Sequence, residues 1–195
     1  GLQHSLMARP WFKAQWTRLV PEPVERSTYV LFASLALAVL MAAWRPLPDG
    51  LWVVDGPLAL VLWAVYLGGW VLMLASTETI DGDDLMGLRQ VRAYRDGRDL
   101  EPIDFRTPSA YGYVRNPIMV GFLVAFWATP RMSVGHLLFA AGMTLYVVVG
   151  VKLEERDLVA AFGDQFRQYR RDVPMFVPRP WRPRPPTPTD PEVDP

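Results

Sequence analysis

PLALVLWAVYLGGWVLMLAST, residues 57–77, contains no charged side chain over 21 residues. A helix needs about 20 mostly apolar residues to cross the ~30 Å hydrocarbon core of a bilayer. Residues 27–44 and 132–151 are also uncharged. Residues 116–130 are uncharged but shorter, and they suit the first arm of a tight hairpin that ends with 132–151. The pattern predicts an all-α, polytopic integral membrane protein with four transmembrane helices, the last two forming a hairpin.

Lysine and arginine are distributed unevenly around these stretches. Of the 20 Lys and Arg residues, only Arg45 and Arg131 fall in the first interhelical loop and the hairpin turn, which leaves 18 elsewhere. Cytoplasmic segments of membrane proteins collect Lys and Arg. We therefore predict that the long loop 78–115 and both ends of the chain are cytoplasmic. An integral membrane location, with these polar segments on the cytoplasmic side, is therefore expected.

The chain divides by composition into four parts. Residues 1–26 form a basic cytoplasmic segment, and residues 27–151 hold the membrane helices. Residues 152–178 form a polar C-terminal segment, and residues 179–195 a proline-rich tail that we expect to be disordered. The chain begins at Gly1 with a stretch typical of the end of an earlier helix, which predicts N-terminal truncation.

Composition argues against several classes of partner. The formal net charge is zero, which gives no support to a nucleic-acid partner. The absence of cysteine removes disulfides, thiolate metal sites and a cysteine nucleophile together. The two histidines, His4 and His136, lie far apart in the sequence, so no metal is expected. The expected partners are membrane lipid and a small molecule.

Polar sequence concentrates in two places on the predicted cytoplasmic side. Residues 105–119 read FRTPSAYGYVRNPIM and end at the start of the third span. Residues 152–178 read KLEERDLVAAFGDQFRQYRRDVPMFVP and begin at the end of the fourth. A hairpin brings the outer ends of its two arms to the same membrane face. We therefore expect these two stretches to lie close together and to form one site.

These two stretches carry a family resemblance. The chain resembles the isoprenylcysteine carboxyl methyltransferase-like membrane methyltransferases, which show G-x-Y-x-x-x-R-H-P-x-Y-x-G, then a hairpin, then E-E-x-x-L-x-x-x-F-G-x-x-Y-x-x-Y-x-x-x-V-P-x-x-x-P. It is most similar to the bacterial methanethiol S-methyltransferase subgroup. The matching residues are Tyr111, Arg115, Pro117, Gly121, Glu154, Glu155, Leu158, Phe162, Gly163, Tyr169, Val173, Pro174 and Pro178. The departures are Ser109 for glycine, Asn116 for histidine, and Met119 and Phe166 for tyrosine.

The resemblance implies a methyltransferase that uses S-adenosylmethionine as cofactor, in a pocket closed by residues 152–178. It also implies a small thiol as substrate, with methanethiol converted to dimethyl sulfide. The residues predicted to bind the cofactor are Tyr111, Tyr113, Arg115, Asn116, Pro117, Met119 and Glu154. Those predicted to act on the acceptor are Glu155, Arg156 and Arg89.

The chemistry of methyl transfer suggests how these residues divide the work. Donor and acceptor must be held close and in line. A carboxylate such as Glu154 can pair with the cationic groups of the cofactor, while Arg115 or backbone amides near Pro117 can hold its carboxylate. Tyr111 and Tyr113 offer aromatic surface for the adenine or the sulfonium.

The thiol needs groups of its own, because it reacts as the thiolate. Glu155 is the candidate base that removes its proton. Arg156 or Arg89 is the candidate cation that stabilises the thiolate.

Other interpretations remain open at this point. Two adjacent glutamates after an apolar run are often only the solvated end of a helix. Within methyl transfer, the acceptor can instead be an isoprenylated cysteine carboxylate or a phospholipid amine. An NADPH-dependent sterol-type reductase shares the R-H-P character and the terminal V-P-x-x-x-P pattern but lacks the double glutamate. A non-catalytic membrane protein is the third possibility, and Asn116 in place of histidine is its best argument.

Overall fold

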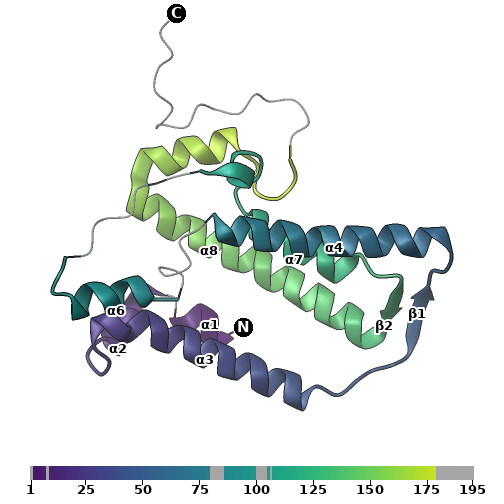
Figure 1. Cartoon of the computed structure of the whole chain (residues 1–195), viewed down its shortest axis with the longest axis horizontal. Coiled ribbons are helices and arrows are strands. Elements are labelled where there is room, and N and C mark those ends of the chain that lie inside the picture. Colours follow the sequence, from purple (N-terminus) through teal and green to yellow (C-terminus); the bar gives the residue numbers. More distant parts are fainter. Residues whose placement is uncertain (1, 8, 80–85, 100–104, 106, 179–195) are drawn as a thin grey trace, which may run out of the picture. The chain divides into compact units, whose positions relative to one another are not determined.

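The computed structural model describes residues 2–7, 9–79, 86–99, 105 and 107–178 of the 195. The chain divides into two compact units, which Figure 1 shows as ribbons. The first unit comprises residues 1–47 and 80–103, and the second comprises residues 48–79 and 104–195. The predicted disordered tail, 179–195, lies outside the described residues, as do parts of the predicted loop 78–115.

The described residues of the first unit include the helices α1 Leu2–Met7, α2 Pro10–Trp16, α3 Glu22–Ala43 and α6 Leu88–Arg95. Helix α3 covers residues 27–43 of the predicted span 27–44 and begins five residues earlier, with Glu22 and Glu25 in its first turn. Carboxylates are favourable there because the helix dipole is positive at its N-terminus. Just before α6, the backbone at Gly87 lies against Ser27, whose hydroxyl donates to the Met86 carbonyl at 3.1 Å.

The second unit contains the polar stretches, and its described residues form helical elements as well. Their bounds are α4 Pro57–Glu78, the 3-10 helix η1 Ser109–Gly112, α7 Pro117–Trp127 and α8 Val134–Asp172. Helices α4 and α7 cross at two glycines: a Cβ at Gly121 would lie 2.6 Å from the Gly69 carbonyl oxygen. Small residues at such a crossing let two membrane helices approach closely enough for backbone contact.

Three of the described helices, α3, α4 and α8, are long and apolar enough to cross a membrane. The predicted helical membrane protein is confirmed at this level. Helix α7 has only 11 residues, so it is about 16 Å long at 1.5 Å per residue, roughly half the ~30 Å apolar core. It ends at Trp127, earlier than the predicted arm 116–130. The fourth crossing and the hairpin therefore stay predictions.

A two-stranded antiparallel ribbon departs from the all-α prediction. Strand β1, Gly50–Val53, pairs with β2, Arg131–Ser133, so that Trp52 faces Met132. The ribbon continues in backbone hydrogen bonds from Val54 to Pro130, 2.8 Å, and from Val134 to Asp49, 2.9 Å. Strands of three or four residues are too short to show an alternating pattern in the sequence, which is why they were missed.

Helix α8 does not end at the predicted boundary between residues 151 and 152. It runs for 39 residues and bends sharply at Gly163, where φ is 57° and ψ is −126°. Glycine is the residue that adopts such angles without a Cβ clash. Figure 1 shows the second arm of α8, after Gly163, turning back from the first. Residues 164–175, here named the closing arm, therefore return toward η1 and the start of α7.

Candidate functional site

The two polar stretches do meet in the structure. The closing arm lies against residues 111–116 through a set of hydrogen bonds. The backbone N–H of Arg115 donates to the Pro174 carbonyl at 2.9 Å. The Tyr169 hydroxyl donates to the Tyr111 carbonyl at 2.7 Å. The Asn116 side-chain amide makes a longer contact of 3.5 Å with the Met175 carbonyl.

A buried ion pair lies at the centre of this contact. The Arg115 Nε donates to Glu155 Oε1 at 2.7 Å, and the two side chains are 9% and 5% exposed. Arg170, which is 44% exposed, places its Nε 3.3 Å from the other oxygen, Glu155 Oε2. Arg115 Nη1 also donates to the carbonyls of Arg170, at 3.0 Å, and of Val173. We name Arg115, Glu155 and Arg170 the Arg115 cluster.

Glu154 and Glu155 differ sharply in their surroundings, although they are adjacent. Glu154 is exposed, whereas Glu155 is buried. Adjacent side chains on a helix point about 100° apart, so this separation is expected. The Glu154 charge acts on Tyr111: burial, and then Glu154, raise the pKa of the Tyr111 phenol to about 12. Tyr111 is therefore protonated at neutral pH, with an exposed carboxylate nearby.

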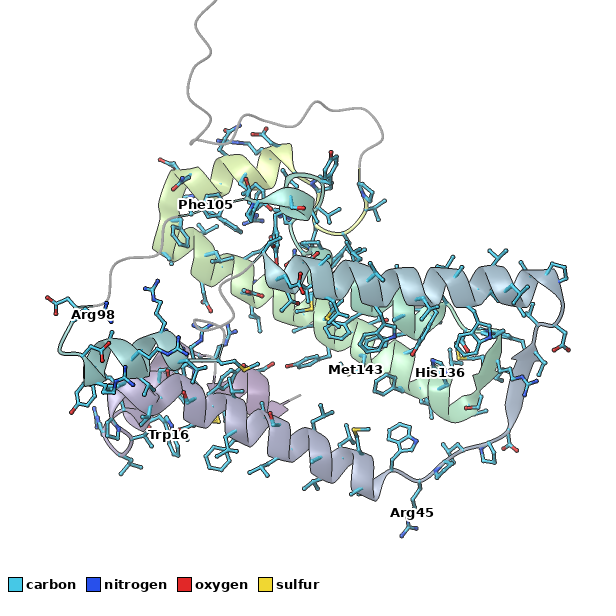
Figure 2. The ribbon with its side chains drawn as sticks, viewed as in Figure 1. Trp16, Arg45, Arg98, Phe105, His136 and Met143 are labelled. Atoms are coloured by element: carbon cyan, nitrogen blue, oxygen red, sulfur yellow. The ribbon has the colours of Figure 1, made fainter. Side chains whose placement is uncertain are left out.

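An aromatic cluster supports the closing arm from the side of the first polar stretch. The ring of Phe105, labelled in Figure 2, lies 5.4 Å from Phe162, 5.8 Å from Phe166 and 5.3 Å from Tyr169, between ring centroids. Phe166 is 2% exposed. Aromatic pairs at these separations contribute about 0.5–1.5 kcal/mol beyond their area burial. Phe166 is therefore a buried packing residue at the position where the family motif has tyrosine.

The other predicted cofactor residues lie along the same segment. Pro117 is buried in the first turn of α7, Met119 is half-buried in that turn, and Tyr113 is exposed. Asn116 occupies the N-cap position of α7 but its side chain makes no capping hydrogen bond. The first turn of a helix leaves backbone N–H groups without intrahelical partners. The backbone amides in the first turn of α7 therefore suit the predicted role of hydrogen-bond donors to the carboxylate of the cofactor.

Ser109 stands where the resembled motif has glycine, and the backbone explains that preference. Its φ is 48°, in the left-handed region. Glycine adopts this region freely, whereas other residues do so uncommonly.

The residues predicted to act on the acceptor come from both units of the chain. Arg156 is exposed on α8 next to the buried Glu155. Arg89 lies in α6, in the first unit, so its distance from the Arg115 cluster is not defined. Within the residues that the structure describes, no group of three His, Asp or Glu side chains is arranged to hold a metal ion.

Sequence reasoning does not identify two residues that shape this site, Arg170 and Gly163. Arg170 is not among the predicted site residues, yet it contacts Glu155. Gly163 was noted only as part of the motif, yet its backbone angles turn the closing arm back. The Phe-Gly pair inside a helical pattern was the available signal, because glycine in a helix interior costs about 1 kcal/mol relative to alanine.

The fold and these contacts define a class: a helical membrane protein whose C-terminal arm closes over a polar site. The chain is 52% identical to the methanethiol S-methyltransferase of Mycobacterium tuberculosis over 93% of its own length and 75% of that protein. For the enzyme of Crocosphaera subtropica the values are 48%, 91% and 70%. The chain belongs to the methanethiol S-methyltransferase family, and the predicted recognition is confirmed.

Further comparisons set the limits of this assignment. The chain is 53% identical to methanethiol S-methyltransferase 1 of Bradyrhizobium diazoefficiens and spans 64% of that protein's length. It is also 32% identical to human Nurim over 80% of its own length and 63% of that protein. No family model matches the chain. No solved structure matches it either.

Proposed function

We propose that this chain methylates methanethiol to dimethyl sulfide with S-adenosylmethionine as methyl donor. The observation that carries the proposal is the identity of 43–53%, over about nine-tenths of the chain, to proteins named methanethiol S-methyltransferase. The site lies on the cytoplasmic face of a bacterial inner membrane in this proposal. The 18-to-2 division of Lys and Arg supports that orientation.

The residues around Glu154 fit the cationic end of the cofactor. S-adenosylmethionine, when bound, supplies an electrophilic methyl group on a sulfonium, beside an α-amino group and a carboxylate. Glu154 is exposed, whereas Glu155 is buried in an ion pair with Arg115, so we assign to Glu154 the contact with the ammonium group of the cofactor. The protonated Tyr111 phenol offers a donor and an aromatic face beside it.

The first turn of α7 fits the carboxylate of the cofactor. Backbone N–H groups at Ile118 and Met119 lie at the positive end of the helix dipole, after Pro117 at the first position. Arg115 was predicted for the same task. Its guanidinium already donates to Glu155 and to two carbonyl groups. We therefore propose the α7 amides as the carboxylate site, and Arg115 as a residue that shapes the site.

The thiol acceptor needs a group that stabilises its thiolate. Arg156 follows Glu155 on α8 and is exposed, which makes it the predicted cation that the second unit can supply. Arg89 remains the alternative from α6. Either guanidinium would lower the free energy of a thiolate placed beside it and so favour loss of the thiol proton.

A headspace assay tests the proposed reaction. Purified protein in lipid nanodiscs, given methanethiol and S-adenosylmethionine, should release dimethyl sulfide, measured by gas chromatography. Reactions with a prenylated cysteine or phosphatidylethanolamine in place of methanethiol should give no methylated product. Methylation of either of these acceptors, with no dimethyl sulfide, would contradict the proposed substrate. Absence of all three products, despite tight cofactor binding, would contradict the proposed chemistry with these acceptors.

Replacement of Glu154 by glutamine tests the cofactor site directly. A charge-assisted hydrogen bond contributes about 1.5–3 kcal/mol, so Glu154→Gln should raise the Kd for S-adenosylmethionine by roughly tenfold to a hundredfold. Isothermal titration calorimetry measures this constant.

Asp164→Asn is the matched control for that variant. The Asp164 side chain is 95% exposed and pairs with Arg167 on the surface, where such pairs contribute little. Its Kd should stay within about twofold of the parent value. If Glu154→Gln binds the cofactor like the control, Glu154 is only a solvated residue on α8.

A further inference from the structure

We infer that Arg115 and Glu155 are positioning residues that fasten the closing arm over the site, and that Glu155 is not the base that takes the thiol proton. The inference deepens the proposed function, on which its cofactor readout rests. It concerns the same site but gives the two residues a task other than binding or proton transfer. Three sets of contacts carry it.

The first set concerns Glu155. Both of its carboxylate oxygens are already engaged, Oε1 by Arg115 at 2.7 Å and Oε2 by Arg170 at 3.3 Å. Its side chain is only 5% exposed. A general base must reach the proton it removes within hydrogen-bonding distance or through one water. A buried carboxylate with both oxygens paired to guanidinium groups is poorly placed for that task and well placed to hold those groups.

The second set concerns Arg115. Its guanidinium donates to Glu155 on the first arm of α8 and to the carbonyls of Arg170 and Val173 at the end of the second arm. The last carbonyls of a helix lack intrahelical partners and lie at the negative end of its dipole. Arg115 therefore caps the second arm while it is anchored to the first. The planar fork of arginine makes several such bonds at once, which lysine cannot reproduce.

The third set links this clamp to the proposed cofactor site. The arm that Arg115 caps carries Tyr169, whose hydroxyl donates to the Tyr111 carbonyl at 2.7 Å. The backbone N–H of Arg115 donates to Pro174 in the same arm. Release of the arm would free the backbone of Tyr111, which lies beside Glu154 in the proposed site. Loss of the Arg115 cluster should therefore weaken cofactor binding more than it slows methyl transfer from bound cofactor.

Hydrogen–deuterium exchange on the cofactor-free protein tests the clamp without reference to activity. In Arg115→Lys, the backbone amides of residues 166–173 should exchange at least about tenfold faster, as expected for the loss of one charge-assisted hydrogen bond. Amides of α4 should be unchanged. Arg167→Lys, on the same arm and with an exposed surface pair to Asp164, is the matched control and should exchange like the parent. Equal exchange in Arg115→Lys and Arg167→Lys overturns the clamp.

Glu155→Gln separates a positioning role from a base. Glutamine keeps the shape of the side chain and one oxygen acceptor for Arg115, but it cannot take a proton. The positioning role predicts a higher KM for S-adenosylmethionine, with kcat at saturation within about threefold of the parent, whereas loss of a general base costs about a hundredfold or more in kcat. A hundredfold loss of kcat with unchanged KM and unchanged exchange would make Glu155 the base and overturn the inference.

Failure of the inference and failure of the proposed function give different results. If the exchange results hold but no dimethyl sulfide forms, the clamp stands and the proposed reaction does not. If dimethyl sulfide forms but the closing arm exchanges alike in all variants, the reaction stands and the clamp does not. Arg115→Ala and Glu155→Ala, combined, complete the test: coupled residues should give a double variant no worse than about the poorer single one.

Discussion

Leucine in place of Gly121 is expected to prevent α4 and α7 from packing, with a loss of more than about 3 kcal/mol in the free energy of unfolding. A Cβ at this position would lie 2.6 Å from the Gly69 carbonyl oxygen and 2.8 Å from the Met73 amide nitrogen. Both are backbone atoms, so no change of rotamer can relieve the clash. The two helices would have to move apart, and closely packed protein interiors tolerate such expansion poorly. Unfolding by sodium dodecyl sulfate in mixed micelles, followed by tryptophan fluorescence, measures the loss.

Gly68→Leu is the control for that result. Gly68 precedes Gly69 on the same helix, yet a Cβ there meets nothing within 4 Å. The same substitution should therefore leave the unfolding midpoint close to that of the parent. A similar loss in both variants would mean that leucine disturbs α4 in general. It would then say nothing about the crossing with Gly121.

Valine in place of Gly163 is expected to open the closing arm. At φ 57° and ψ −126° a β-branched residue is strained, and backbone strain of this kind costs about 1–3 kcal/mol. The closing arm, which hydrogen bonds hold against residues 111–116, is the part that should shift to relieve this strain. The Kd for S-adenosylmethionine should therefore rise by about tenfold to a hundredfold, measured by calorimetry.

Gly142→Val provides the comparison within α8. A Cβ at either glycine meets nothing within 4 Å, so the two variants differ in backbone conformation and not in space. Valine at Gly142 faces an ordinary helical backbone and should leave cofactor affinity within about twofold of the parent, since helix propensities differ by less than 1 kcal/mol. If Gly163→Val binds the cofactor equally well, the bend is not needed for the site.

The sequence predicted the features that depend on long-range composition. Uncharged stretches located α3, α4 and the first arm of α8, because burial in lipid requires an apolar surface along a whole helix. The same reasoning placed residues 105–119 beside residues 152–178, and the contact of Arg115 with Glu155 agrees with it. These predictions needed no knowledge of individual side-chain partners.

What the sequence could not predict depends on single residues and on contacts between distant ones. A membrane helix that continues past the apolar boundary looks the same in sequence as one that stops there, so the length of α8 was missed. Helical geometry alone implies that the adjacent Glu154 and Glu155 point in different directions, and the structure has Glu154 exposed and Glu155 buried. Helical geometry could not show that Arg170, 15 positions beyond Glu155 and after a bend, would return to the same carboxylate.

The β1–β2 ribbon has a consequence for how the chain is made. Trp52 donates to the carbonyl of Thr129, 77 positions later, so the ribbon closes only after that much further chain has left the ribosome. Such distant pairing slows folding, because the entropy of closing the loop is lost before the contacts form. Helix α4 is therefore made before α7 is available to pack against it. Its side chains permit this: in the finished structure only Gly69 and Ser76 of α4 are buried, and lipid solvates the rest as well as a protein partner would.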